Sequence, residues 1–396
     1  MKLIKLGDVT TKIGSGATPR GGANVYQPEG TAFIRSQNVL DNRMRLDELA
    51  RIDDQAASAL RGVTVEAGDV LLNITGDSIA RCCLIEERVL PARVSQHVAI
   101  IRTTTAMDSR YLQRVLVNPP MKNYLLATSD GGTRNALTKA MISTLEVPCP
   151  PIAEQRAIAE VLGALDDKIV ANECAVGIGE KLVRALFDRA ARNGSRERID
   201  KVASLITRGV TPKYVESDGM TVLNQKCVRG QRVELSPARM MMPLESRRER
   251  ILRRNDVLVN STGFGTLGRA ARWTRSDLEV TVDSHITIVR FDDKLTEPAC
   301  AGVGLLELQS QIEALAEGST GQTELRRDLL GALELRLAPP AMQAELGRQL
   351  RQFDDLALAL RTENDRLAAT RDELLPPLMS GKIRVSDAEK TVEAVV

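Results

Sequence analysis

One apolar stretch that occurs twice decides how this chain is organised: Gln96–Arg102 (QHVAIIR) and Ser284–Arg290 (SHITIVR). The chain contains only two histidines, His97 and His285, and they occupy the same place in the two stretches, 188 residues apart. A short apolar run of this kind, bounded by polar residues, is typical of a buried β-strand. The chain therefore carries two copies of one module.

Other segments repeat in the same order. The matched pairs are Gly16–Arg20 (GATPR) with Gly209–Lys213 (GVTPK), and Asp69–Gly76 (DVLLNITG) with Asp256–Gly263 (DVLVNSTG). The spacing drifts between 187 and 193 residues, as expected where short insertions collect in loops. Two tandem copies predict a protein with pseudo-two-fold symmetry.

The composition excludes several classes of protein. A length of 396 residues allows two ordinary domain cores. The net charge of +2 gives no global basic field, and 3% aromatic residues argue against a surface that stacks single-stranded bases. Six scattered cysteines without CxxC spacing predict reduced thiols and no metal site. No leader or apolar run of 18 residues is evident, so we expect a soluble, cytoplasmic protein.

Each module continues into a long stretch rich in Glu, Arg, Ala and Leu, which begins after Pro150-Pro151 and after Pro339-Pro340. Proline suits the first turn of a helix, and alternating steps of four and three residues between apolar positions predict a coiled-coil seam. About 40 residues at 1.5 Å per residue give helices roughly 60 Å long. The predicted seam positions are Ile158, Leu162, Leu165, Ile169, Asn172, Val176, Gly179, Val183 and Leu186, and Leu346, Leu350, Phe353, Ala357, Leu360, Asn364, Leu367, Arg371 and Leu374.

The two helices could each pack on their own globular domain or pack on each other, and the repeat symmetry favours antiparallel packing on each other. We therefore expect a mixed α/β fold, in which two globular domains in tandem repeat are separated by two long antiparallel coiled-coil helices. The expected segments are a first globular domain at 1–150, a first helix at 151–194, a second globular domain at 195–338, a second helix at 339–382 that ends at Pro376-Pro377, and a disordered tail at 383–396.

Two motifs suggest enzymes but lack the necessary context. Gly263–Gly268 matches the dinucleotide pattern GxGxxG, but its repeat counterpart lacks the glycines. Asn118–Met121 (NPPM) approaches the NPP[Y/F] motif of adenine-N6 methyltransferases, but methionine replaces the aromatic residue that stacks the flipped base. We interpret the second motif as a helix interruption, and no residue pattern in the chain predicts catalysis.

The stretch Leu145–Leu162 (LEVPCPPIAEQRAIAEVL) resembles the strand-into-helix signature that closes each target-recognition domain in the specificity subunits of type I restriction-modification systems. The segments Gly16–Pro19, Thr262–Arg269 and Leu378–Lys382 (LMSGK) are also similar to features of that family. The resemblance covers nearly the whole chain. The second copy, Ala338–Glu345, keeps the prolines and the glutamine but lacks the Glu-Gln-Arg triplet.

The resemblance implies that the two globular domains are target-recognition domains and that the chain is a non-catalytic subunit. Its partners would be double-stranded DNA, two modification subunits that methylate adenine N6 and, optionally, two restriction subunits, with no membrane. S-adenosylmethionine and ATP with magnesium would bind those partners and not this chain.

Each recognition domain would read one half of a split target through polar side chains in the major groove. Because Arg35–Asn38 and Asn224–Cys227 differ, the two half-sites should differ, and the target should be asymmetric. The predicted DNA-binding residues are Arg20, Arg35, Gln37, Asn38, Asp77, Ser78, Arg81, Arg134 and Asn135, and Lys213, Asn224, Gln225, Lys226, Thr266, Arg269, Gln322 and Thr323.

Alternatives remain open at this point. The chain could be a DNA adenine methyltransferase, or a coiled-coil assembly protein that does not read DNA. It could also be the fused or separate specificity chain of a methylation-dependent nuclease of another type.

Overall fold

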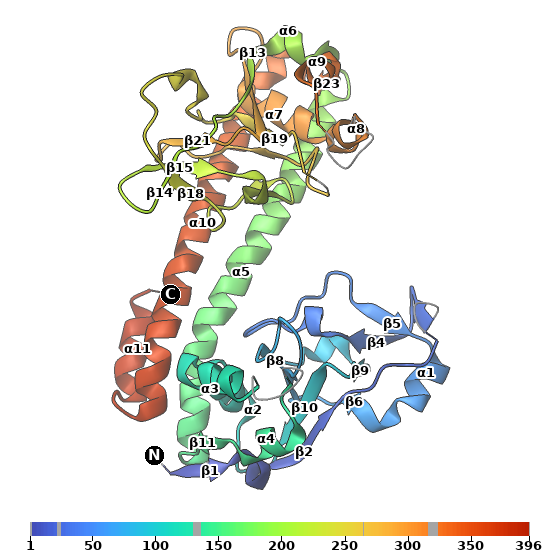
Figure 1. Cartoon of the computed structure of the whole chain (residues 1–396), viewed down its shortest axis with the longest axis vertical. Coiled ribbons are helices and arrows are strands. Elements are labelled where there is room, and N and C mark those ends of the chain that lie inside the picture. Colours follow the sequence, from blue (N-terminus) through green and yellow to red (C-terminus); the bar gives the residue numbers. More distant parts are fainter. Residues whose placement is uncertain (1, 22–24, 130–135, 264, 316–323, 396) are drawn as a thin grey trace. The chain divides into compact units, whose positions relative to one another are not determined.

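The computed structural model is a mixed α/β structure that describes residues 2–21, 25–129, 136–263, 265–315 and 324–395. The chain forms two compact units (Figure 1). Unit 1 contains residues 1–172 and 362–396, and unit 2 contains residues 173–361. These units differ from the five expected segments, because each long helix contributes residues to both of them.

Unit 1 contains the first module, built on two sheets. A four-stranded antiparallel sheet has the order β2-β10-β7-β8, and a five-stranded mixed sheet has the order β3-β5-β4-β9-β6. The strands are β1 (Leu3–Lys5), β2 (Thr10–Ser15), β3 (Tyr26–Gln27), β4 (Thr31–Ile34), β5 (Ala50–Ile52), β6 (Thr64–Val65), β7 (Val70–Asn73), β8 (Cys82–Leu84), β9 (Ala92–Val94), β10 (Val98–Thr103) and β11 (Glu146–Pro148). The helices are α1 (Asp54–Ala59), α2 (Ser109–Val117), α3 (Pro119–Ser129) and α4 (Lys139–Thr144).

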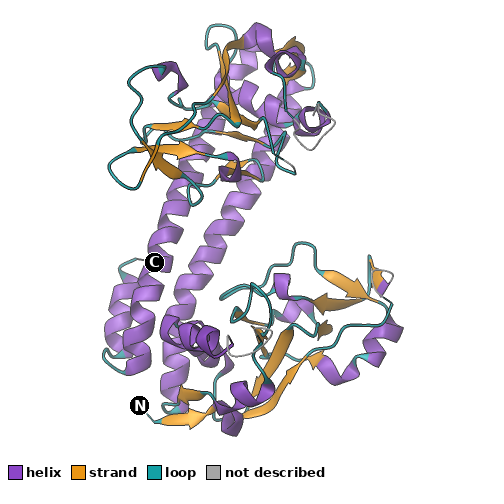
Figure 2. Cartoon of the chain, in the orientation of Figure 1, coloured by secondary structure: helices purple, strands orange, loops and turns teal. Residues whose placement is uncertain are grey.

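Unit 2 contains the second module and repeats this design. Its sheets have the orders β13-β22-β19-β20 and β14-β18-β15-β21, so the four-stranded antiparallel sheet of unit 1 recurs strand for strand. The strands are β12 (Ser195–Arg198), β13 (Ala203–Arg208), β14 (Tyr214–Val215), β15 (Met220–Leu223), β16 (Val228–Arg229), β17 (Arg232–Val233), β18 (Arg239–Met241), β19 (Val257–Asn260), β20 (Ala270–Arg272), β21 (Val280–Val282), β22 (Ile286–Phe291) and β23 (Glu334–Leu337). The short helices are α6 (Ile199–Val202), α7 (Pro298–Leu306), α8 (Gln309–Ala314) and α9 (Arg327–Ala332). Helices and strands occur together in both units (Figure 2).

The central strands form where the sequence predicts buried runs. β7 and β10 pair in antiparallel register in the first module, and β19 and β22 pair in the same way in the second. Every residue of β7 and β19 is buried. A strand that is covered on both faces needs apolar residues at successive positions, which is why these strands lack polar alternation.

The two long helices are α5 (Ile152–Ala191) and α10 (Pro340–Ser380). In unit 1, Asp166 of α5 forms an ion pair with Arg371 of α10 at 2.7 Å, and Asn172 donates to Asn364 at 2.9 Å. Rising numbers along α5 meet falling numbers along α10, so the two helices are antiparallel there. The seam positions predicted for Asn172 and Asn364 are confirmed, and the hydrogen bond between their side chains is an added finding.

The helix pair is also antiparallel in unit 2. Phe187 of α5 packs in one cluster with Leu346 and Leu350 of α10, whereas Gly179 faces Phe353. A Cβ on Gly179 would lie 2.0 Å from the Phe353 ring, so glycine makes room for this side chain. None of the predicted seam positions is exposed.

The C-terminal segment corrects two expectations. Pro376 and Pro377 lie inside α10, which continues to Ser380. The segment 383–396, expected to be a disordered tail, instead contains helix α11 (Val385–Glu393). Ala388 and Val392 of α11 are buried in the core of unit 1, so tertiary packing orders this short helix (Figure 1).

Two smaller expectations concern helices and membranes. The helix interruption expected at Asn118–Met121 is observed, because Asn118 separates α2 from α3. Among the residues described, no helix combines the length and the apolar character that crossing a bilayer would require.

Candidate nucleic-acid interface

Four turns gather at the same end of the four-stranded sheet in each module, and we call this surface the loop end. β2 and β7 finish there and β10 begins there, because the antiparallel register places Ser15 beside Ala99 and Asn73 beside Val98. The turns of the loop end are 16–20, 36–38, 75–78 and 95–97 in unit 1, and 209–213, 225–227, 262–263 with 265–266, and 283–285 in unit 2.

The first turn requires glycine in both modules. The N–H of Gly16 donates to the carbonyl of Val98 at 2.9 Å, and the N–H of Gly209 donates to that of Ile286 at 2.9 Å. A Cβ on Gly16 would lie 2.1 Å from the carbonyl oxygen of Val94, and one on Gly209 would meet the equivalent oxygen at the same distance. Since no side chain fits at this separation, the glycine brings the turn directly against the neighbouring strand.

A buried asparagine ties the second turn to the sheet. The side-chain amide of Asn73 donates to the carbonyl of Ser36 at 2.9 Å, and that of Asn260 donates to the carbonyl of Gln225 at 2.9 Å. Both asparagines are fully buried. Because a buried amide that loses its partner is costly, these bonds fix where each turn lies.

The two histidines occupy equivalent places at the loop end, as predicted. Nδ1 of His97 lies 2.6 Å from Oγ1 of Thr75, and Nδ1 of His285 lies 2.7 Å from Oγ1 of Thr262. Both imidazole side chains are exposed, although the strands that follow them are buried. Each ring is therefore held at Nδ1 by its threonine, and the side chain of Gln96 also lies 3.3 Å from Nε2 of His97.

Asp283 supports the histidine turn of the second module. Its carboxylate accepts a hydrogen bond from the N–H of His285 at 2.9 Å. Burial raises the pKa of the Asp283 carboxyl group, and the hydrogen bond from His285 acts in the opposite direction. Ser95 occupies this position in the first module, so the two turns have the same geometry with different charge.

The described DNA-binding candidates differ in exposure. Those exposed at the loop end are Arg20, Gln37, Asp77, Lys213 and Lys226. Those partly buried are Arg35, Ser78, Arg81, Asn224, Gln225, Thr266 and Arg269. Arg134, Asn135, Gln322 and Thr323 lie outside the residues that the structure describes.

Several partly buried candidates shape the turns. Arg35 donates to the carbonyl of Glu48 at 3.1 Å, and Arg269 donates to that of Gly265 at 2.8 Å. The Asn224 side chain accepts a hydrogen bond from a backbone N–H two residues later, at 2.9 Å. These contacts leave the exposed residues as the better candidates for DNA contact.

Asn38 requires a correction. It is fully buried, its Oδ1 accepts from the N–H of Arg35 at 3.0 Å, and its Nδ2 donates to the carbonyl of Arg45 at 2.9 Å. Its counterpart in the second module is the buried Cys227. We therefore assign Asn38 a structural role and leave it out of the proposed DNA surface.

A buried ion pair stabilises the opposite end of the central strands in each module. Arg102 contacts Asp69 through two hydrogen bonds of 2.7 and 2.8 Å, and Arg290 contacts Asp256 through bonds of 2.8 and 2.7 Å. Hydrogen bonding to Asp69 raises the pKa of Arg102. Burial raises the pKa of Asp256, although its bonds to Arg290 lower it in part.

A buried glutamine joins each globular module to its long helix. Oε1 of Gln155 accepts from the N–H of Asp108 at 2.8 Å, and its Nε2 donates to the carbonyl of Pro150 at 2.8 Å. Gln343 accepts from the N–H of Glu297 at 2.8 Å in the same way. This contact explains why the glutamine persists in the second copy although the rest of the triplet is lost.

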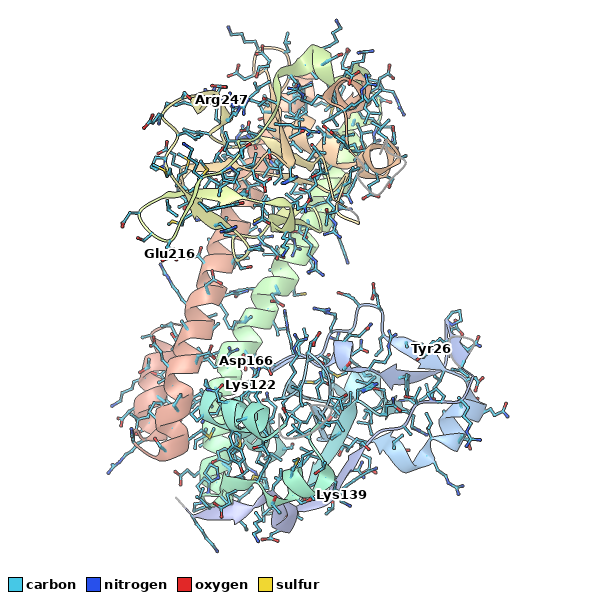
Figure 3. The ribbon with its side chains drawn as sticks, viewed as in Figure 1. Tyr26, Lys122, Lys139, Asp166, Glu216 and Arg247 are labelled. Atoms are coloured by element: carbon cyan, nitrogen blue, oxygen red, sulfur yellow. The ribbon has the colours of Figure 1, made fainter. Side chains whose placement is uncertain are left out.

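An Arg–Asp pair makes a second connection, with a different arginine in each module. Asp166, labelled on α5 in Figure 3, forms an ion pair with Arg114 of α2. Asp354 of α10 instead pairs with Arg272 of β20 at 2.7 Å. Leu84 occupies the register position of Arg272 in the first module. The carboxylate is thus kept, and its cation comes from a helix in one module and a strand in the other.

Reasoning from the sequence missed three structural pairs: the Thr–His contacts, the buried asparagines and the glutamine junctions. The sequence did contain a signal for these pairs: the residues that form them are identical in the two modules, whereas their exposed neighbours differ. In the described part of the chain, no group of three or more His, Cys, Asp or Glu side chains could hold a metal ion.

Residues 1–175 match the family model described as Type I restriction modification DNA specificity domain. The chain is 21% identical over 420 residues to a type I restriction enzyme MjaX specificity subunit of Methanocaldococcus jannaschii, covering 96% of this chain and 93% of that protein. It is 24% identical over 189 residues to the HindI specificity subunit of Haemophilus influenzae, covering 47% of this chain and 39% of that protein. The crystal structure of a type I restriction-modification S subunit from M. genitalium has a TM-score of 0.59 at 13% identity, with 95% of each chain covered.

The matched family model covers the first module and the first part of α5, and the second module repeats the strand order of the first. Because the similarity to a specificity subunit extends over almost the whole chain, the chain resembles the specificity subunits of type I restriction-modification systems along its length and not only in its first module. Subunits of this class recognise the DNA sequence and are not the catalytic ones.

Proposed function

We propose that this chain reads an asymmetric, two-part DNA target, with the loop end of each module contacting one half-site. The main support for this proposal is that both modules have the same loop-end framework, whereas the exposed residues on that framework differ. Gln37 is the middle residue of the turn Ser36–Asn38, and Lys226 is the middle residue of the equivalent turn Gln225–Cys227.

The difference between these two side chains has direct chemical consequences. The Gln37 amide can donate to and accept from an adenine edge, whereas the Lys226 ammonium group can only donate and suits guanine O6 and N7. Arg20 and Lys213, exposed on the adjacent turns, supply a cation in both modules. Two modules with the same framework but different exposed side chains would recognise two different half-sites, as an asymmetric target requires.

We further propose that the chain acts in a complex with two modification subunits and, optionally, two restriction subunits. S-adenosylmethionine, and ATP with magnesium, would bind those partners. This assignment rests on the family, and on a chain whose sequence contains no pattern for methyl transfer or nucleotide hydrolysis.

The test is to map methylated adenines in the genome of a host that carries the complex. The variants Gln37→Lys and Lys226→Gln exchange the residues of the two modules. We expect Gln37→Lys to change only the first half-site and Lys226→Gln to change only the second. Lys201→Gln is the matched control, since Lys201 is an exposed lysine on α6, at the opposite end of β13 from the turn 209–213.

Other outcomes would contradict the proposal. Methyl transfer by the purified chain alone would identify it as a methyltransferase. Unchanged methylation in both loop-end variants would favour an assembly protein that does not read DNA. A change in both half-sites from one substitution would exclude independent reading by the two modules.

A further inference from the structure

The histidine at the loop end is the same in both modules, although the exposed residues around it differ. His97 and His285 each lie one residue before a central strand, which begins at Val98 in the first module and Ile286 in the second. We propose that each histidine donates a hydrogen bond from Nε2 to a phosphate oxygen of the DNA backbone in its half-site. This inference rests on the proposed function and adds a contact that does not depend on the base sequence.

The ring is well fixed before any DNA arrives. The carbonyl of His97 accepts from the N–H of Ile74 at 3.0 Å, and that of His285 accepts from the N–H of Ser261 at 2.8 Å. Together with the threonine contacts at Nδ1, these bonds hold both the backbone and the side chain. A donor held in this way loses little conformational entropy on binding.

The direction of the threonine contact decides which hydrogen the ring presents, because the hydroxyl group can donate to Nδ1 or accept from it. A neutral imidazole that accepts the hydroxyl proton at Nδ1 carries its own hydrogen on Nε2, and a protonated imidazole carries one there as well. In the first module the amide nitrogen of Gln96, which can only donate, lies 3.3 Å from this Nε2, so the Gln96 side chain has to turn away before Nε2 can donate to a phosphate; in the second module the preceding residue is Ser284. When the threonine hydroxyl donates to Nδ1, the outward nitrogen is a donor, which suits an anionic oxygen.

Open space beside the histidine allows the DNA backbone to approach. Gly76, next to Thr75, has a φ of +75° and no atom within 4 Å of the place where its Cβ would be. In the second module the counterpart of Gly76 is Gly263, whose Cβ would lie 2.4 Å from Oε1 of Gln225, whereas Gly265 has a φ of +70° and no atom within 4 Å of its Cβ position. The open space therefore lies directly beside Thr75 in the first module and three residues after Thr262 in the second.

The identity of the residue favours phosphate over a base. Residues that read bases in two different half-sites are expected to differ, as Gln37 and Lys226 do. A residue kept in both modules can contact only what both half-sites share, and the phosphate backbone is common to every sequence.

The test measures DNA binding by the complete complex of this chain with its modification subunits. Three duplexes are used: the target mapped by methylation, the same duplex with one half-site scrambled, and an unrelated duplex. We expect His97→Ala and His285→Ala each to weaken binding to all three by a similar factor of about ten to a hundred. His97→Gln, which keeps a side-chain donor, should recover part of the loss.

Methylphosphonate substitution identifies the contact, because it removes the charge of one phosphate at a time. With wild-type protein, one phosphate in the first half-site should be sensitive because of His97 and one in the second because of His285. His97→Ala should abolish the first sensitivity and leave the second intact. Lys201→Gln should alter neither.

Several results would overturn the inference. If the histidine variants lose affinity only for the mapped target, the residues read bases. If they bind all three duplexes as wild type does, the residues do not contact DNA. If the histidine variants give one of these two results while the wild-type complex still prefers the mapped duplex, only this inference fails. If the wild-type complex shows no preference among the three duplexes, the proposed function fails as well.

Discussion

Replacing Arg272 by leucine should strongly destabilise unit 2. Leucine is the residue at the equivalent position of the first module, Leu84. Nη2 of Arg272 lies 2.7 Å from Oδ1 of Asp354, and the two side chains are only 7% and 4% exposed. Arg272 also donates to Asn255 at 3.1 Å. Removing the cation leaves a buried carboxylate without its partner, which typically costs about 3–5 kcal/mol.

The loss should depend on pH in a defined direction. Burial raises the pKa of Asp354, and Arg272 partly opposes this rise, so the variant should have a still higher pKa in the folded protein. A carboxyl group whose pKa is raised by folding stabilises the folded state when protonated, and this contribution is lost as the pH rises through that pKa. The deficit of the variant should therefore be largest at neutral pH and should shrink on acidification.

The single tryptophan of the chain makes this measurement specific to unit 2. Trp273 is 2% exposed, so its fluorescence reports the unfolding of that unit in denaturant. The double variant Arg272→Leu/Asp354→Leu removes both charges and should recover most of the stability and lose the pH dependence. The control is Arg248→Leu, which breaks an exposed pair with Glu279 and should cost only about 0–1 kcal/mol.

A loss in Arg272→Leu no greater than that of the exposed control would refute this reasoning. A double variant as unstable as the single one would also refute it, since the cost would then come from packing rather than from an unpaired charge.

Three further predictions concern unit 1. Gly16→Ala should lower the free energy of unfolding of unit 1 by about 1–3 kcal/mol, because its Cβ would lie 2.1 Å from the carbonyl oxygen of Val94. Circular dichroism should show this loss, while the unfolding of unit 2 followed by Trp273 fluorescence stays unchanged. Deleting residues 384–396 should lower the free energy of unfolding by about 2–4 kcal/mol, because α11 buries apolar side chains in the core; an unchanged melting curve would contradict its packing. Asn172→Val should lower the free energy of unfolding by about 1–2 kcal/mol in denaturant titrations, because it removes the side-chain hydrogen bond to Asn364. The double variant Asn172→Val/Asn364→Val should recover that stability but fix the register of the two helices less well.

Much of the fold followed from the sequence because its signals are local or repeated. The central strands were predicted from short apolar runs, and the helix seam followed from a regular step of three and four residues. The position of Gly179 opposite Phe353 fits this pattern, since the heptad places both residues in the seam. The repeat also predicted that His97 and His285 would be equivalent.

The sequence alone did not identify which polar residues are available for binding. Asn38 and Gln37 are neighbours, yet one is buried in a turn and the other is exposed, because the turn is fixed by Asn73 from a different strand. Local composition contains no information about such a contact, which joins residues 37 positions apart.

The sequence by itself determined that this chain has two modules, two long helices and a repeated framework. Only the tertiary structure decided that Arg272 neutralises Asp354, that α11 packs on the core and that each histidine is held by a threonine. Periodicity and repetition are properties of the chain order, and they persist before folding. Ion pairing, docking and side-chain orientation depend on residues that become neighbours only after distant segments have packed together.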